Sequence, residues 1–248
     1  MLQAVYPRSE EWKSVVNAVA TLIEEANFEF TPEGIKLRSM DPSHIALVNL
    51  EWPNNTFEKY VCDQEYLISV RIEDLQKVMK RAEKKDKVEL ALGEENTLLF
   101  KLYNGYRREF LIHLIEGEVG QTPLPKVPFS ITAKLLTKTV KKVLADISIV
   151  SDQVSIKAEE GKLIFSGSSE LGRASIIIEK DSPDLVELSV KESSEATYSV
   201  EYLLNFIKAV GISTYVTLDF ASKMPIRLDF PLSEGGIKLQ FYLAPRIE

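Results

Sequence analysis

The pattern of apolar residues in this chain occurs twice, once on each side of residues 116–128. In each half, a helical pattern is followed by a hairpin pattern, a second helical pattern and several short alternating segments. The second helical patterns match 128 residues apart, as Ile72, Leu75 and Val78 against Val200, Leu203 and Phe206. Val88, Leu90 and Leu92 return at the same spacing as Val216, Leu218 and Phe220. Coincidence would not keep this order, so the sequence predicts an internal duplication.

The first helical pattern and the hairpin repeat at slightly smaller spacings. The helical matches, 124 residues apart, are Trp12, Val16, Val19 and Ile23 against Leu136, Val140, Val143 and Ile147. Glu33-Gly34 of the hairpin returns 127 residues later as Glu160-Gly161. We attribute the change in spacing, from 124 to 128 residues along the repeat, to small insertions in turns.

The first half contains more predicted strands than helices. The helices are predicted at Ser9–Ala26, with Ser9 as N-cap, and at Arg71–Lys84. The strands are predicted at Asn27–Thr31, Gly34–Arg38, His44–Trp52, Lys87–Leu92, Leu98–Tyr103 and Arg107–Ile115. We therefore expect an α+β fold of two duplicated domains, each with two helices packed on one face of an antiparallel sheet.

The segment between the halves, Glu116–Pro128, shows neither the helical nor the alternating strand pattern of apolar residues. Its three prolines, Pro123, Pro125 and Pro128, remove backbone donors and favour extended conformations before them. Its composition is typical of a domain linker. We expect domains at residues 1–115 and 129–248, joined by residues 116–128, with the apolar side chain of Leu124 resting on another part of the protein.

Two predicted strands are candidates for contact between molecules. Arg107–Ile115 and Ala174–Glu179 lie in opposite halves, and exposed sheet edges must be covered. Their apolar residues are Phe110, Ile112, Leu114, Ile176, Ile177 and Ile178. Head-to-tail pairing of this kind closes into a ring or continues as a fibre. The alternative is that the strands pair within one chain.

Groups able to perform chemistry are scarce. The chain has two histidines and one cysteine, Cys62, which excludes internal disulfides and zinc sites built on several thiolates, and we expect neither a metal nor a cofactor. Ser39, Asp41 and His44 share one loop and superficially offer a catalytic triad, but triad members normally come from distant segments. The lone cysteine suits a reducing compartment, and no apolar stretch approaches the length of a membrane span. We expect a soluble, non-secreted protein without enzymatic activity.

The positive charge is concentrated on the predicted helices, although the formal net charge is −7. Six of the eleven residues from Lys77 to Lys87 are basic, and Lys77, Lys80 and Lys84 form one stripe. A solvated helix face is the ordinary explanation of such a stripe. However, the other predicted helices also carry lysines, at Lys13, Lys134, Lys138, Lys141, Lys142 and Lys208. An acidic protein can present a basic surface to phosphates in this way.

Two motifs carry a family resemblance. Residues 39–48, Ser-Met-Asp-Pro-Ser-His-Ile-Ala-Leu-Val, closely resemble a segment of the proliferating cell nuclear antigen family, the DNA sliding clamps of eukaryotes and archaea. The terminal residues 243–248, Leu-Ala-Pro-Arg-Ile-Glu, resemble that family's C-terminus, and Glu170-Leu171-Gly172 and residues 202–206 also have counterparts. The absence of a short acidic extension after Glu248 favours an archaeal source.

The resemblance implies a closed trimeric ring with sheets outside and helices inside. The ring would encircle duplex DNA without sequence preference and would tether DNA polymerase, clamp loader, flap endonuclease and DNA ligase through short glutamine/aromatic peptide motifs. It would be cytoplasmic and nucleoid-associated in an archaeon, or nuclear in a eukaryote. Identical chains or paralogous subunits could form the ring. The alternatives are an enzyme using the residue 39–44 loop and a protein-interaction scaffold that never meets DNA.

The resemblance also assigns residues to sites. The segment at residues 116–128 would be the interdomain connecting loop, covering a hydrophobic partner pocket of Met40, His44, Leu47, Leu124, Pro225, Tyr242, Ala244 and Pro245. The family's DNA-facing cations correspond to Lys13, Lys77, Lys80 and Lys208. Ser14, Ala20 and Ala145 stand where some relatives have basic residues. We therefore expect Lys84, Lys138, Lys141 and Lys142 to contribute more to the DNA-facing surface.

Overall fold

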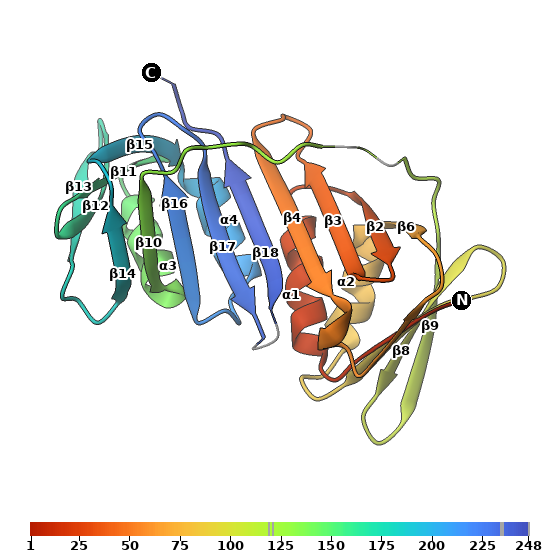
Figure 1. Ribbon diagram of the computed structural model, residues 1–248. Coiled ribbons are helices and arrows are strands. Elements are labelled where there is room, and N and C mark those ends of the chain that lie inside the picture. The colour runs from red at the N-terminus through yellow and green to blue at the C-terminus, as the bar shows by residue number, and fades with distance from the viewer. Residues whose placement is uncertain (119, 121, 234–235, 248) are drawn as a thin grey trace. The chain divides into compact units, whose positions relative to one another are not determined.

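The computed structural model describes residues 1–118, 120, 122–233 and 236–247. Val119 and Gln121 of the connecting segment and Glu248 of the C-terminal motif lie outside the described residues. The chain divides into two compact units, Met1–Thr122 with Pro231–Leu239, and Pro123–Phe230 with Gln240–Glu248. The described residues contain four α-helices and eighteen strands, so the fold is α+β (Figure 1).

The first unit has two helices and two groups of strands. Its helices are α1 (Ser9–Ala20) and α2 (Ile72–Arg81), and a 3₁₀ turn spans Asn54–Thr56. One sheet has the order β5 (Lys59–Cys62), β1 (Leu2–Tyr6), β7 (Lys87–Leu92), β8 (Thr97–Tyr103), β9 (Arg107–His113). The second group runs β4 (Ala46–Pro53), β3 (Gly34–Met40), β2 (Glu25–Thr31), β6 (Tyr66–Arg71). Neighbouring strands in both groups are antiparallel.

The second unit repeats this plan. Its helices are α3 (Thr137–Ile147) and α4 (Val200–Ala209). One sheet has the order β13 (Gly172–Glu179), β12 (Lys162–Ser169), β11 (Gln153–Glu159), β15 (Ser194–Ser199). The other strands follow the order β14 (Leu185–Val190), β10 (Ile131–Leu136), β16 (Tyr215–Phe220), β17 (Ile226–Leu232), β18 (Ile237–Leu243). The end of β17 and the start of β18 are counted with the first unit in the division above.

The structure gives the duplication a single spacing. The helices α1 and α3 begin 128 residues apart, at Ser9 and Thr137, and α2 and α4 begin 128 apart, at Ile72 and Val200. The predicted match of Trp12 with Leu136 is therefore wrong, because Leu136 is the last residue of β10. A shift of four residues is about one helical turn and keeps the apolar face in phase, so the apolar pattern alone could not detect it.

In the first unit, a helix packs between two sheets. The ring of Trp12 on α1 lies 4.5 Å from Trp52 on β4 and 6.1 Å from Phe100 on β8, measured between centroids. All three side chains are buried. The strands of each half thus divide between two sheets, which corrects the expectation of helices covering one face of a single sheet. Figure 1 shows α1 and α2 side by side against β4 and its neighbours.

Several predicted boundaries are also corrected. The first helix ends at Ala20 instead of Ala26, because residues from Glu25 onward pair with β6. Ser9 is the first helical residue and not the N-cap, and its hydroxyl donates to the Glu83 carbonyl at 2.6 Å. The second helix ends at Arg81, so Lys84 lies in the following turn. Lys134 lies on β10 and not on a helix.

Candidate functional site

The loop between β3 and β4 is organised by the Asp41 carboxylate. This buried group accepts the backbone N–H groups of Ile45 at 2.9 Å, Ala46 at 2.8 Å and Ser43 at 3.3 Å. The His44 N–H donates to the Asp41 carbonyl at 3.0 Å, and His44 adopts a left-handed conformation with φ 58°. The loop is therefore internally braced, and it presents a partly exposed Met40 and an exposed His44. This explains why an aspartate follows Met40, and gives Asp41 a structural role.

The C-terminal candidate residues belong to the second unit and are held by its backbone. The Arg246 N–H donates to the Thr197 carbonyl on β15 at 2.7 Å, immediately after Ala244 and Pro245. The loop containing Pro225 is fixed by the Tyr198 hydroxyl, which donates to the Met224 carbonyl at 2.7 Å. Burial raises the pKa of this tyrosine, so it stays a neutral donor.

The eight predicted pocket residues differ in what they offer a ligand. Leu47 is only 2% exposed and Tyr242 only 6%, so these two contribute little surface. Partial or full exposure is found at Met40, His44, Leu124, Pro225, Ala244 and Pro245. The first three predicted residues, Met40, His44 and Leu47, lie in the first unit, and the remaining five lie in the second.

All eight predicted DNA-facing lysines are exposed: Lys13, Lys77, Lys80, Lys84, Lys138, Lys141, Lys142 and Lys208. Two of them have carboxylate partners. Lys77 lies 2.9 Å from Glu73 and 3.4 Å from Asp74, and these hydrogen bonds raise its pKa. Lys84 lies 3.3 Å from Glu10. Within the described part of the chain, the other six form no ion pair.

Counting only partners in the described ranges, helix α3 carries more lysines without an ion pair than any other helix does. Lys138, Lys141 and Lys142 lie on its first two turns, and that first turn contains no acidic residue. On α1, Lys13 is the one exposed side chain among residues 9–20, because the rest of that helix is buried or half-buried. The helical lysines are thus the groups best able to meet an anionic ligand.

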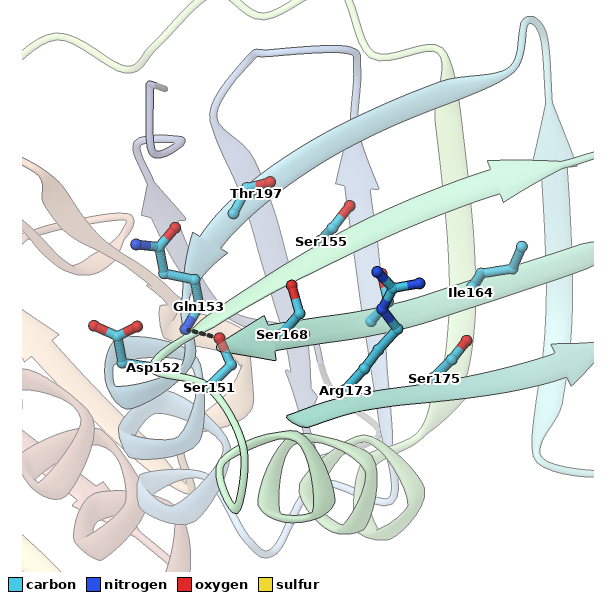
Figure 2. Close-up of a pocket in the computed structure, with 11 residues that line it drawn as sticks. Ser151, Asp152, Gln153, Ser155, Ile164, Ser168, Arg173, Ser175 and Thr197 are labelled. Atoms are coloured by element: carbon cyan, nitrogen blue, oxygen red, sulfur yellow. Dashed lines mark hydrogen bonds between the residues drawn. The ribbon is translucent and has the colours of Figure 1, made fainter. Parts of the chain in front are cut away.

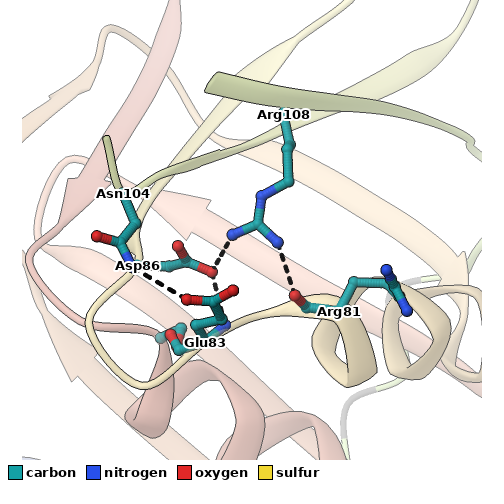
Figure 3. Close-up of polar contacts among 6 residues, drawn as sticks. Arg81, Glu83, Asp86, Asn104 and Arg108 are labelled. Carbon is teal, nitrogen blue, oxygen red and sulfur yellow. Dashed lines mark hydrogen bonds and ion pairs between the residues drawn. The ribbon is translucent and has the colours of Figure 1, made fainter. Parts of the chain in front are cut away.

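The turn after α2 is anchored to the strand β9 (Figure 3). The Arg108 guanidinium donates to the Arg81 carbonyl at 2.7 Å, at the C-terminal end of α2, and to Asp86 at 2.5 Å. Asp86 also accepts the Glu83 N–H at 2.6 Å, and the Asn104 amide donates to the Glu83 carboxylate at 3.2 Å. This network fixes the backbone that carries Lys84. Reasoning from the sequence did not find it.

The two strands predicted to contact another molecule are both edge strands. β9 ends the order β5-β1-β7-β8-β9, and β13 begins the order β13-β12-β11-β15. The predicted contact residues are not equally available, since Ile112 is 5% exposed and Ile178 is buried, whereas Ile177 is 53% exposed. Phe110, Leu114 and Ile176 are half-buried. The most exposed apolar side chain on β9 is Leu111, at 64%, which sequence reasoning missed.

Two of the hollows in the second unit lie beside candidate residues or on an exposed sheet face. A groove of 720 Å³ between α3 and β13 is lined by Lys138, Lys142, Val143 and Ile176–Ile178, among others. The second hollow, of 530 Å³, lies on the sheet β13-β12-β11-β15 (Figure 2). A row of hydroxyl groups crosses its floor, from Thr197 through Ser155 and Ser166 to Ser175 on successive strands. Its charged lining residues, Arg173 and Asp152, have opposite signs, so it favours neither anions nor cations.

No group of three or more metal-ligating side chains suited to a metal ion occurs within the residues that the structure describes. No described helix is long and apolar enough to cross a membrane.

The arrangement of two repeated α+β units matches a known class of proteins. The family model described as the N-terminal domain of proliferating cell nuclear antigen matches residues 1–114, and that of the C-terminal domain matches residues 123–246. The chain is similar over 99% of its length to the crystal structure of PCNA from Thermococcus kodakaraensis, with a TM-score of 0.95, 26% identity and 100% of that chain covered.

Curated relatives agree with this match. The chain is 42% identical to the DNA polymerase sliding clamp of Nitrosopumilus maritimus, over 97% of this chain and 96% of the relative. It is 39% identical to that of Thermofilum pendens over the full length of both. The chain therefore belongs to the proliferating cell nuclear antigen family.

Proposed function

We propose that this protein is a DNA sliding clamp, a processivity factor that encircles duplex DNA and tethers DNA polymerase, and that it has no catalytic activity of its own. Its family membership supports the general function, because the curated relatives are named DNA polymerase sliding clamps. The observation that carries the proposal for this chain is the set of six exposed lysines on α1, α2, α3 and α4 that form no ion pair with any residue the structure describes. The archaeal relatives favour a cytoplasmic location at the nucleoid.

The DNA contacts are to phosphates and are unevenly divided among the helices. Lysines act as point charges on the DNA backbone and do not read base edges bidentately, so no sequence preference follows. Among the described residues, Lys138, Lys141 and Lys142 have no carboxylate partner, whereas Lys77 is held by two. We therefore assign the larger share of phosphate contact to α3.

The ring closes through the edge strands β9 and β13 of neighbouring subunits, giving a trimer. Both strands lie at the end of their sheets in the part of the chain that the structure describes, and each presents one strongly exposed apolar side chain, Leu111 and Ile177. The groove between α3 and β13 extends the apolar surface beside that edge. The subunits are copies of this chain or paralogous clamps, and light scattering of the purified chain alone distinguishes the two.

Partner enzymes bind through the residue 39–44 loop, the connecting segment and the C-terminal residues, as the family resemblance implies. The candidates are DNA polymerase, clamp loader, flap endonuclease and DNA ligase, each offering a short peptide with a glutamine and aromatic side chains. The rigid Asp41-centred loop and the partial exposure of Met40 and Leu124 support this assignment.

Primer extension tests the proposal. With a partner polymerase and clamp loader, the wild-type protein should lengthen the products made in one binding event. Replacing Met40 and Leu124 together by alanine should weaken peptide binding at least tenfold and shorten the products, while the oligomer stays intact. A protein-interaction scaffold would bind the peptides but leave the products unchanged.

A further inference from the structure

The first half of the connecting segment is held by two side chains of the first unit. The Asn27 amide, on β2, donates from Nδ2 to the carbonyl of Glu118 at 2.9 Å. The Arg38 guanidinium, on β3, donates from Nη1 to the carbonyl of Thr122 at 3.3 Å. Both acceptors are backbone oxygens, so these two bonds hold the segment without depending on its side chains.

The segment also enters this region in close contact with β6. The Ile115 N–H donates to the Ser69 carbonyl at 2.9 Å. A Cβ atom at Gly117 would lie 1.8 Å from the Ser69 hydroxyl oxygen and 2.6 Å from the Asn27 side-chain oxygen. A larger residue at this position would have to displace the Ser69 side chain, so glycine allows this close approach. The chain therefore lies directly against β2 and β6 before it reaches the prolines.

Arg38 is itself oriented by a buried group. Its Nε donates to the side-chain oxygen of Asn49 on β4 at 3.1 Å, and Asn49 is buried. With one nitrogen fixed in this way, the planar guanidinium presents Nη1 to the Thr122 carbonyl in a defined direction. A lysine could not satisfy both acceptors with the same geometry.

The next residues of the segment have no such anchors. In the described stretch from residue 123 to 126, no side chain or backbone group makes a hydrogen bond, and Pro123 and Pro125 cannot donate one. Leu124 follows Thr122 by two residues, so a fixed Thr122 carbonyl limits its excursion to about 7 Å, given about 3.6 Å of chain per residue. The Arg38 contact is thus the last restraint before the partly exposed Leu124.

We propose that Asn27 and Arg38 are positioning residues for partner binding. They hold the connecting segment in its binding geometry before a partner arrives, which lowers the entropy lost on binding. This inference rests on the proposed function, since it assumes that partners contact the connecting segment. Neither side chain needs to touch the partner for the effect.

The test uses the full-length protein and the variants Asn27→Asp, Arg38→Met and their combination. Asn27→Asp keeps the shape but places a carboxylate oxygen against the Glu118 carbonyl, and Arg38→Met keeps the aliphatic stem without its donors. Lys126→Ala is the control, because this exposed side chain lies on the same segment and makes no hydrogen bond within the described residues. Arg38→Lys should give an intermediate result.

Two readouts separate the inference from the proposed function. Hydrogen exchange of the free protein, at the amides of Gly120 and Thr122, should become at least fivefold faster in the double variant and stay unchanged in Lys126→Ala. The Kd for a Gln-x-x-Leu-x-x-Phe-Phe peptide, measured by calorimetry, should rise about tenfold in the double variant.

Unchanged exchange in the double variant would show that the two contacts do not hold the segment, and would overturn the inference. Faster exchange with wild-type affinity would overturn it as well, because the restraint would then have no role in binding. Failure of the wild-type protein to bind the peptide would instead remove the proposed partner site, and the inference with it.

Discussion

The guanidinium of Arg108 on β9 lies 2.5 Å from the carboxylate of Asp86, which is 0% exposed and 22 residues earlier in the chain. The same guanidinium donates to the carbonyl of Arg81 at the end of α2. One guanidinium therefore joins a candidate subunit-contact strand to the end of a candidate DNA-contact helix and to a buried carboxylate in the turn that follows it.

Removing the cation should destabilise the protein strongly. Arg108→Ala leaves the Asp86 charge buried without its partner, which should cost about 3–5 kcal/mol of unfolding free energy. Arg107→Ala is the matched control, because its ion pair with Glu109 is largely exposed and should be worth less than about 1 kcal/mol. Urea denaturation of both variants measures the difference. Equal losses would show that the buried pair has no special weight.

The hydrogen-bonded side chains of Glu89 on β7 and Tyr103 on β8 should make the stability of the protein depend on pH in the acid and in the alkaline range. Burial opposes ionisation of Glu89, but hydrogen bonds from Tyr103, Gln3 and Lys101 outweigh it and hold its pKa below the usual 4.5. The unfolded chain then binds the proton first, so this stability is lost as the pH falls below about 4.5. Burial and the nearby Glu89 raise the pKa of Tyr103 to about 12. That contribution is present below pH 10 and is lost between pH 10 and 12.

Glu89→Gln should remove the acid-side dependence and reduce the alkaline one only in part, because burial, the larger cause of the raised Tyr103 pKa, remains. The unfolding free energy of the variant should change less than that of the wild type between pH 5 and 3, and also above pH 10. Thermal unfolding at a series of pH values in these two ranges measures the change in unfolding free energy. Parallel curves for the two proteins would contradict the assignment.

The helices should contribute unequally to DNA binding. Replacing Lys138, Lys141 and Lys142 by glutamine should flatten the dependence of log K on log salt by about 0.9 for each lysine that contacts a phosphate. Replacing Lys77 and Lys84 should flatten it less per residue, because both already have carboxylate partners. Fluorescence anisotropy with duplex DNA over a salt series provides the slopes. A larger effect from Lys77 and Lys84 would reverse the assignment.

Subunit contact should depend on the exposed residues of the edge strands. Leu111→Glu or Ile177→Glu should reduce the oligomer to monomers by sedimentation, with an unchanged circular dichroism spectrum, because both side chains are exposed in the single chain. Ile112→Glu, in contrast, should lower the melting temperature, since it buries a charge in its own unit. Intact oligomers in both exposed-site variants would place the interface elsewhere.

The sequence predicted the elements whose signals are local. The hairpin turn at Thr31–Gly34 is one of them, because Thr-Pro-Glu-Gly is a turn sequence by itself, and in the structure Thr31 pairs with Gly34, whose φ is 143°. Short strands such as Leu2–Tyr6 and Lys59–Cys62 were not predicted, since four or five residues contain too few alternations to be recognised. The end of the first helix was misplaced because Leu22 and Ile23 keep the helical period after the helix has ended at Ala20.

In the candidate site, too, the sequence predicted the local features but not those that depend on tertiary contacts. Charged helix positions are exposed almost wherever they occur, so all eight lysines could be placed on the surface from the sequence. The alternating pattern in β9 showed which residues share a face of the strand. Which face is buried depends on how the rest of the unit packs against it, and the pattern does not contain this information. Ile112 therefore proved buried, and Leu111 was missed. The anchoring of the connecting segment by Asn27 and Arg38 depends on contacts across 91 and 84 residues, which no local pattern contains.

Retention on DNA of different topology tests the central claim most directly. The purified protein is loaded by its clamp loader onto a nicked circular duplex, the complex is isolated by gel filtration, and half of it is linearised with a restriction enzyme. We predict that the protein stays on the circle at high salt and leaves the linear duplex within minutes, and that Leu111→Glu is retained on neither. Equal retention on circular and linear DNA would contradict encirclement and show that direct contacts alone hold the protein.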